Sequence, residues 1–197
     1  RYNLYDNLFF KWWYCKTKVG CFLWWQLQLH YWINKKFKIF ICSAFGGCKN
    51  IKTFNISKNV NEIGKNVFIN CTNLKSINVD KNNKKYATVN GSLYNKKKNN
   101  LIAYPGGRTS SYKVSKGTEY IGNQAFSGAT VKKVVLPNTV KNIGYKVFEN
   151  CKNLNNITIP SSVSFIDAKA FDNTKYYNTS KYWYKGQLYV ANCVVDS

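Results

Sequence analysis

The chain has 197 residues, of which 45% are hydrophobic, and its 30 lysine and arginine residues outnumber its 8 aspartate and glutamate residues. This apolar content is enough to form a core, and it excludes a globally disordered chain. The net charge of +22 favours an acidic partner or an anionic surface. Specific nucleic-acid recognition is not expected, because it favours bidentate arginine contacts and the chain has two arginines, Arg1 and Arg108.

The beginning of the chain differs in amino-acid composition from the rest. Residues 11–32, KWWYCKTKVGCFLWWQLQLHYW, contain the only histidine, His30, and five of the six tryptophans. The tryptophans of this segment are Trp12, Trp13, Trp24, Trp25 and Trp32. The sequence contains no methionine, so we expect a fragment of a longer protein. No run of 18 uncharged apolar residues is present, and the sequence therefore predicts no transmembrane helix.

Two hypotheses explain the tryptophan-rich segment. Back-translation shifted by one nucleotide can turn it into a sequence similar to residues 99–114, with leucine, alanine, an aromatic residue and Gly-Gly in the same order. Residues 1–42 are then a degenerate copy of a later insert, frameshifted over residues 11–35. The alternative is an aromatic patch that binds carbohydrate or lies at a membrane interface.

A repeat of about 23 residues runs through the rest of the chain. Four segments align, at 43–60, 63–80, 121–140 and 143–163, and a fifth begins at 165–174. A phenylalanine recurs in each of them, at Phe45, Phe68, Phe126, Phe148 and Phe171. Between Phe68 and Phe126 the step is long enough for one period and an insertion of about 35 residues. We divide the chain into repeats at 43–80 and 115–175, an insert at 81–114, and the start of a further insert at 176–197.

Each period has the same physical pattern. The motif IGxxxF is typical of a short helical or irregular turn, and the following NLxxIxI alternates apolar and polar residues as a half-buried strand does. Burial of about six apolar side chains per period contributes on the order of 9–18 kcal/mol, which the cost of ordering about 23 residues offsets. One period therefore cannot fold alone, and the sequence predicts stacked coils that share a core.

The segment NLNNITIPSSVSFIDAKAF, residues 153–171, resembles the BspA-like leucine-rich repeats, also called the Treponema pallidum type. Asp167 replaces the glycine usual in that family. The resemblance covers residues 43–175 and implies a leucine-rich-repeat solenoid. Short parallel strands would lie on one face, short helical or irregular turns on the other, and β-hairpin inserts between them. It also implies a secreted or cell-surface protein that works in adhesion.

The insert contains two apolar strand pieces, SLYN and NLIAYP, which flank a lysine-asparagine turn and predict a hairpin. Inserts with a similar pattern are common in the resembled family. Because loops on a rigid scaffold often carry binding, we expect exposed tyrosines on this insert at Tyr94, Tyr104 and Tyr112.

Three cysteines, Cys48, Cys71 and Cys151, occupy equivalent places in their repeats. We interpret them as small buried residues inside the coils, and a disulfide between Cys48 and Cys71 is left open. A catalytic cysteine needs an activating base, and His30 lies outside the repeats. The eight acidic residues are scattered, so we expect no enzyme, no cofactor and no metal site.

The sequence thus favours a non-catalytic binding protein, with host or neighbouring-cell surface proteins or acidic glycans as partners. The alternative is a structural spacer that presents another domain. A rigid sheet surface carrying lysines would give many weak contacts. The candidate binding residues, besides the three tyrosines, are Lys75, Lys96, Lys97, Lys98, Lys132 and Lys133.

Overall fold

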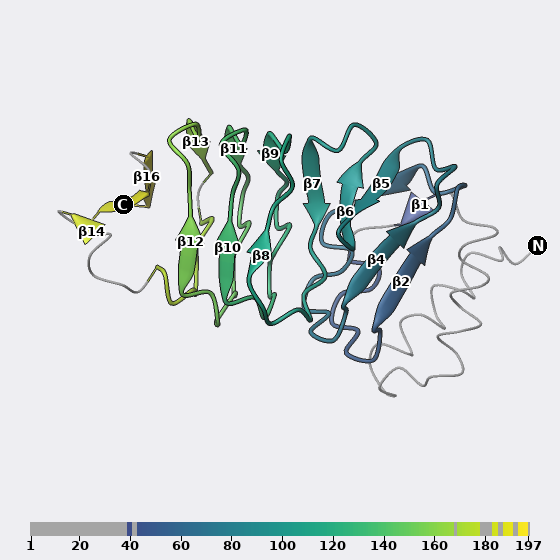
Figure 1. Ribbon diagram of the computed structural model, residues 1–197. Coiled ribbons are helices and arrows are strands. Elements are labelled where there is room, and N and C mark those ends of the chain that lie inside the picture. Colours follow the sequence, from purple (N-terminus) through teal and green to yellow (C-terminus); the bar gives the residue numbers. More distant parts are fainter. Residues whose placement is uncertain are drawn as a thin grey trace, which may run out of the picture.

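The computed structural model describes residues 39–40, 43–167, 169–177, 183–184, 187–190 and 193–196. Within these residues the chain winds as a solenoid of strands and turns (Figure 1). No helix of the described residues has the length and apolar character needed to cross a membrane. The hypotheses for residues 1–38 lie outside the described residues.

One face of the solenoid is made of the NLxxIxI strands, which run parallel as the alternation predicts (Figure 1). They form a two-stranded sheet, β2-β4, and a three-stranded sheet, β12-β10-β8. We call their solvent-exposed side the strand face. Its strands are β2 (Thr53–Ile56), β4 (Ser76–Val79), β8 (Tyr112–Lys113), β10 (Lys133–Val135) and β12 (Asn156–Thr158).

A second set of strands lies along the top of the solenoid in Figure 1. Four parallel strands and an antiparallel hairpin form a six-stranded sheet in the order β13-β11-β9-β7-β6-β5. Its members are β5 (Tyr86–Val89), β6 (Ser92–Asn95), β7 (Asn100–Ala103), β9 (Tyr120–Ile121), β11 (Asn142–Ile143) and β13 (Phe165–Ile166). At the N-terminal end, β1 (Ile39–Phe40) pairs in parallel with β3 (Glu62–Ile63).

Near the C-terminus a small antiparallel sheet has the order β14-β15-β16. Its strands are β14 (Trp183–Tyr184), β15 (Gln187–Val190) and β16 (Cys193–Asp196). Where the sequence predicts the start of a further insert, the chain therefore leaves the parallel pattern. The exact limits of that insert stay a prediction.

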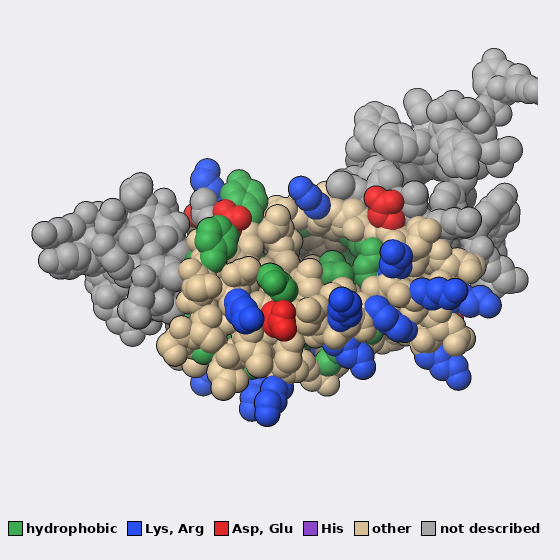
Figure 2. Space-filling model, turned by 90° about the horizontal axis from the view of Figure 1, so that it is seen from above, with side chains coloured by type: hydrophobic (Ala, Val, Ile, Leu, Met, Phe, Trp, Pro, Cys, Tyr) green, Lys and Arg blue, Asp and Glu red, His purple; other side chains and the backbone are tan. Residues whose placement is uncertain are grey.

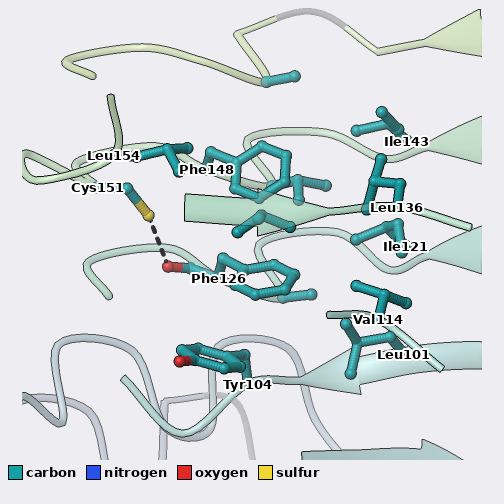
Figure 3. Packing of buried hydrophobic residues seen from close by; sticks show 14 of the residues in the cluster. Leu101, Tyr104, Val114, Ile121, Phe126, Leu136, Ile143, Phe148, Cys151 and Leu154 are labelled. Atoms are coloured by element: carbon teal, nitrogen blue, oxygen red, sulfur yellow. Dashed lines mark hydrogen bonds between the residues drawn. The ribbon is translucent and has the colours of Figure 1, made fainter. Parts of the chain in front are cut away.

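The repeated phenylalanines stack inside the coils (Figure 3). The ring centroids of Phe126 and Phe148 are 5.0 Å apart, and those of Phe148 and Phe171 are 5.4 Å apart. Phe45 and Phe68 form a separate stack, with ring centroids 5.8 Å apart. Beside the main stack, Ile121, Ile143 and Ile166 occupy equivalent positions of the parallel strands. Within each of the two groups of coils, the shared core expected from the period is confirmed.

The turn around each phenylalanine is irregular, and it contains two residues in the left-handed backbone region. The residue two places before the phenylalanine has φ between 54° and 59°, as at Lys146 and Lys169. The residue two places after it is always asparagine or glycine, which adopt this region most easily, for example Asn150. These turns stack through backbone hydrogen bonds, such as the 3.0 Å bond from Phe126 N–H to the Val147 carbonyl.

The insert is continuous with the solenoid. β6 and β7 form the predicted antiparallel hairpin, and β7 then pairs in parallel with β9. Tyr104 stacks on Phe126 with ring centroids 4.7 Å apart, so a tyrosine takes the place of the repeated phenylalanine. Tyr112 in β8 is paired with Val134 in β10, and both side chains are buried. Residues 100–114 therefore complete a coil of their own, which the spacing of phenylalanines alone does not reveal.

A junction between two cores lies at this insert. One cluster of buried residues runs from Phe45 to Leu93, and the other runs from Tyr94 to Tyr176. Arg108 joins the coils there, because its Nε donates to the Lys75 carbonyl at 2.6 Å and its Nη1 donates to the Asn90 carbonyl at 2.7 Å. Gly107 N–H donates to the Leu74 carbonyl at 2.9 Å.

Candidate functional site

The strand face carries the first group of predicted binding residues. Lys133 is exposed as the first residue of β10, and Lys132, which directly precedes the strand, is exposed as well. The structure adds Lys113 on β8, which is also exposed and lies on the neighbouring strand. Lys113 was missed because residues 81–114 were interpreted as a β-hairpin insert and not as part of the repeats. The strands β2, β4, β8, β10 and β12 contain no acidic residue.

The other predicted lysines have a different setting. The ammonium group of Lys75 donates to the Gly107 carbonyl at the junction. Lys96 donates to the carbonyls of Lys81 at 3.3 Å and Asn83 at 2.5 Å. Lys97 and Lys98 are exposed at the tip of the β6–β7 hairpin. The structure thus places Lys96, Lys97 and Lys98 on a hairpin separate from Lys132 and Lys133.

The prediction that Tyr94, Tyr104 and Tyr112 are exposed is wrong. Their exposed fractions are 0%, 3% and 6%. The insert packs into the solenoid instead of standing out from it, and the rings fill coil positions beside Phe126. Burial raises the pKa of Tyr104 to about 12 and raises the pKa of Tyr112 further. These side chains therefore support the core and are not available to a partner.

The repeated cysteines have a structural role. Cys71 and Cys151 are fully buried, and each thiol donates to the carbonyl of the phenylalanine one coil earlier. The two sulfur–oxygen distances, to Phe45 and to Phe126, are both 3.0 Å (Figure 3 shows the second). Cys48 is half-buried, and no disulfide joins it to Cys71. The interpretation of these residues as small buried groups is confirmed for Cys71 and Cys151.

Cys151 should react very slowly with thiol reagents while the protein is folded. Burial raises the pKa of its thiol to about 12, so the thiolate is scarce at neutral pH as well as inaccessible. With an iodoacetamide pulse at pH 8 and peptide mass spectrometry, we expect modification of Cys151 only after denaturant is added. Rapid labelling of Cys151 in the native protein would contradict this assignment.

A groove of about 480 Å³ opens on the face formed by β7, β9, β11 and β13. Figure 2 looks onto this face and shows the hollow with apolar side chains inside it and along its margin. The coil at residues 63–69 forms one wall, and the sheet forms the floor. The groove was not predicted from the sequence, because it depends on how the insert separates two coils.

The floor of the groove combines aromatic and amide side chains. Asn100, Tyr120, Asn142 and Phe165 are the outward residues of four neighbouring parallel strands, and they are in register. We call these four residues the groove row. Tyr120 is 41% exposed and Phe165 is 54% exposed, which makes them unusual among the large apolar residues of the described chain. A hint was present in the sequence, because each residue precedes a buried leucine or isoleucine.

Buried polar atoms line the same groove. Asn66 Oδ1, Asn100 Oδ1 and Ser127 Oγ have no hydrogen-bond partner within the described residues. Ser127 is 6% exposed. Because an unsatisfied buried polar atom costs about 1–3 kcal/mol, such atoms at a groove favour a ligand that supplies the missing bonds.

The described residues hold no cluster of three or more histidine, cysteine, aspartate or glutamate side chains able to bind a metal ion. Lys146 pairs with Glu149 on the same turn, a structural ion pair at the surface. The expectation that the protein uses no metal and no cofactor stays a prediction.

Comparisons with known proteins agree on one family. Residues 20–99 and 102–186 match the BspA type leucine rich repeat region in six copies. A crystal structure of the pneumococcal vaccine antigen PcpA is similar, with 31% identity and a TM-score of 0.64 over 70% of this chain and 34% of that one. No curated protein matches the chain.

A second similar structure is a leucine rich cell surface protein from Faecalibacterium prausnitzii, with 30% identity and a TM-score of 0.56. It matches over 66% of this chain and 34% of its own length. The chain thus spans about a third of either of these relatives. The family match extends over more than half of the chain and agrees with the parallel coils, the stacked phenylalanines and the irregular turns. The chain therefore belongs to the BspA-type leucine-rich repeat family.

Proposed function

We propose that the chain is part of a secreted or cell-surface protein that binds, without catalysis, acidic surfaces of proteins or glycans through its strand face. The observation that carries this proposal is a group of three exposed lysines at two adjacent strands: Lys113 in β8, Lys133 in β10, and Lys132 directly before β10. The similar protein from Faecalibacterium prausnitzii is a cell surface protein, which supports the location.

The geometry of the strand face suits such binding. Backbone hydrogen bonds hold β8, β10 and β12 in one sheet, so the lysines project from a rigid base. The loss of conformational entropy on binding is then limited to the side chains. Because none of these strands contains an acidic residue, the positive charges are not neutralised on their own face. A net charge of +22 attracts an anionic partner over a longer range.

Each single contact is expected to be weak, since an exposed ion pair contributes about 0–1 kcal/mol. Useful affinity therefore comes from several contacts at once. This mechanism predicts strong salt sensitivity, because the screening length falls from about 10 Å at 0.1 M salt to about 3 Å at 1 M.

A pair of triple variants tests the location of binding. In Lys113→Gln, Lys132→Gln, Lys133→Gln, three charges are removed from the strand face. In the control, Lys116→Gln, Lys141→Gln, Lys152→Gln, three exposed charges are removed elsewhere, so the net charge is the same. We expect the first variant to lose about tenfold in affinity for immobilised heparin or an acidic protein, and the control to lose much less.

The salt dependence separates this mechanism from others. Binding should weaken strongly between 0.1 M and 0.5 M sodium chloride. Equal losses in the two triple variants would show that net charge matters and the strand face does not. Binding of neither probe, together with no attachment of protein-coated beads to cells, would favour the structural spacer.

A further inference from the structure

We propose that the groove beside β7, β9, β11 and β13 is a second binding site, which takes an uncharged oligosaccharide. The sugar chain would lie across the four strands, along the groove row of Asn100, Tyr120, Asn142 and Phe165. The inference rests on the general binding role proposed above, but it concerns a different face and a different chemistry.

The groove row has the spacing that a chain of linked rings requires. Neighbouring strands of the sheet lie about 4.8 Å apart, so Tyr120 and Phe165, two strands apart, are separated by roughly 10 Å. That distance is spanned by two or three linked sugar rings. The two aromatic rings alternate with the amides Asn100 and Asn142 along the row. The faces of successive sugars can thus pack on aromatic rings while their edges meet amides.

The polar groups of the groove match the hydroxyl groups of a sugar. An amide side chain offers two donors and an acceptor with two lone pairs, and a sugar hydroxyl can both donate and accept. Asn66 Oδ1, Asn100 Oδ1 and Ser127 Oγ are buried and have no partner within the described residues. A hydroxyl that donates to these oxygens would satisfy atoms that the protein leaves unsatisfied.

Tyr120 and Phe165 are the exposed aromatic residues that line the groove. Tyr120 and Phe165 are turned outward while their neighbours Ile121 and Ile166 fill the core. Contact between exposed aromatic rings and water is unfavourable. A ligand that covers the rings removes this contact, which favours binding. The groove volume of about 480 Å³ lies in the range usual for small-ligand sites.

An uncharged sugar fits better than a peptide or an acidic ligand. An added peptide strand needs a free backbone edge, but β7, β9 and β11 are each paired on both sides. At the floor of the groove, a ligand therefore meets side chains and not an unpaired backbone edge of these strands. Its charged lining residues are Lys65 and Asp167, of opposite sign, and none of the groove row is charged. This face contrasts with the lysine-rich strand face.

The test uses the 197-residue chain and three soluble probes: cello-, chito- and galacto-oligosaccharides of three to six rings. Isothermal titration calorimetry should show binding of at least one probe. Tyr120→Ala and Phe165→Ala should each weaken that binding by about tenfold or more. Tyr120→Phe should keep most of the affinity, because it retains the ring. Tyr145→Ala is the matched control, since Tyr145 is 37% exposed and lies outside the groove.

Further outcomes decide between the two sites. Oligosaccharide binding should not change between 0.1 M and 0.5 M sodium chloride, and it should survive the triple substitution of Lys113, Lys132 and Lys133. Absence of binding by all three probes would overturn the glycan site while leaving the strand-face proposal intact. Equal effects of Tyr120→Ala and Tyr145→Ala, or binding of a random peptide library at the groove in place of sugars, would also overturn it.

Discussion

Replacement of Phe148 by alanine should lower the free energy of unfolding by about 3–5 kcal/mol, which is a large part of the stability of a domain of this size. Phe148 is fully buried, and its ring packs between those of Phe126 and Phe171 at centroid distances of 5.0 Å and 5.4 Å. Loss of the ring leaves a cavity between two coil interfaces. Because a solenoid is stabilised by interfaces between nearest neighbours, both interfaces weaken at once.

Urea denaturation followed by circular dichroism measures this effect, and Phe165→Ala is the matched control. Phe165 is 54% exposed and is turned outward beside the buried Ile166, so its loss should change stability by about 0.5 kcal/mol or less. A Phe148→Ala protein that unfolds at the wild-type midpoint would show that the stacked rings do not hold the coils together.

The stacked rings were predictable because the period is read directly from the positions of phenylalanine. The signal is strong at Phe126, Phe148 and Phe171, where the steps are one period each. Tyr104 was not recognised as a member, because its coil has a tyrosine in place of the phenylalanine and is preceded by a hairpin. Burial depends on which coil a strand joins, and that pairing is not visible in the local sequence.

The candidate sites also contain some residues that the local sequence predicts and others that it does not. Exposure of Lys133 followed from the alternation along β10, which is a local property. The groove row could not be found in this way, because Asn100, Tyr120, Asn142 and Phe165 are about 20 residues apart in sequence and meet through strand register. A search for the residue that precedes each buried leucine or isoleucine would have aligned them.

The insert has a structural consequence as well. It fills one coil of the stack and sets the two cores apart, so a groove opens on one face while the coils touch at the other. The backbones approach closely at the Pro105-Gly106-Gly107 segment, which is buried. The two glycines of this segment allow two backbones to come into contact.

Replacement of Gly107 by alanine should therefore separate the two cores. A Cβ atom at Gly107 would lie 2.5 Å from the carbonyl carbon of Asn73 and 2.7 Å from the nitrogen of Leu74. These are backbone atoms, which cannot move aside as a side chain can. The chain must shift, and the shift would lengthen the hydrogen bond from Gly107 N–H to the Leu74 carbonyl. We expect a loss of about 3 kcal/mol in the free energy of unfolding.

Hydrogen exchange measured by mass spectrometry shows which coils lose stability. In Gly107→Ala, amides of the coil at 63–80 should lose protection before those of the coils at 120–171, because the latter keep their own core. Gly106→Ala is the matched control, since its Cβ would lie 3.3 Å from the Cys71 carbonyl oxygen and should cost about 1 kcal/mol. Uniform loss of protection across both cores, or a larger effect at Gly106, would contradict the view that Gly107 is the contact on which the junction depends.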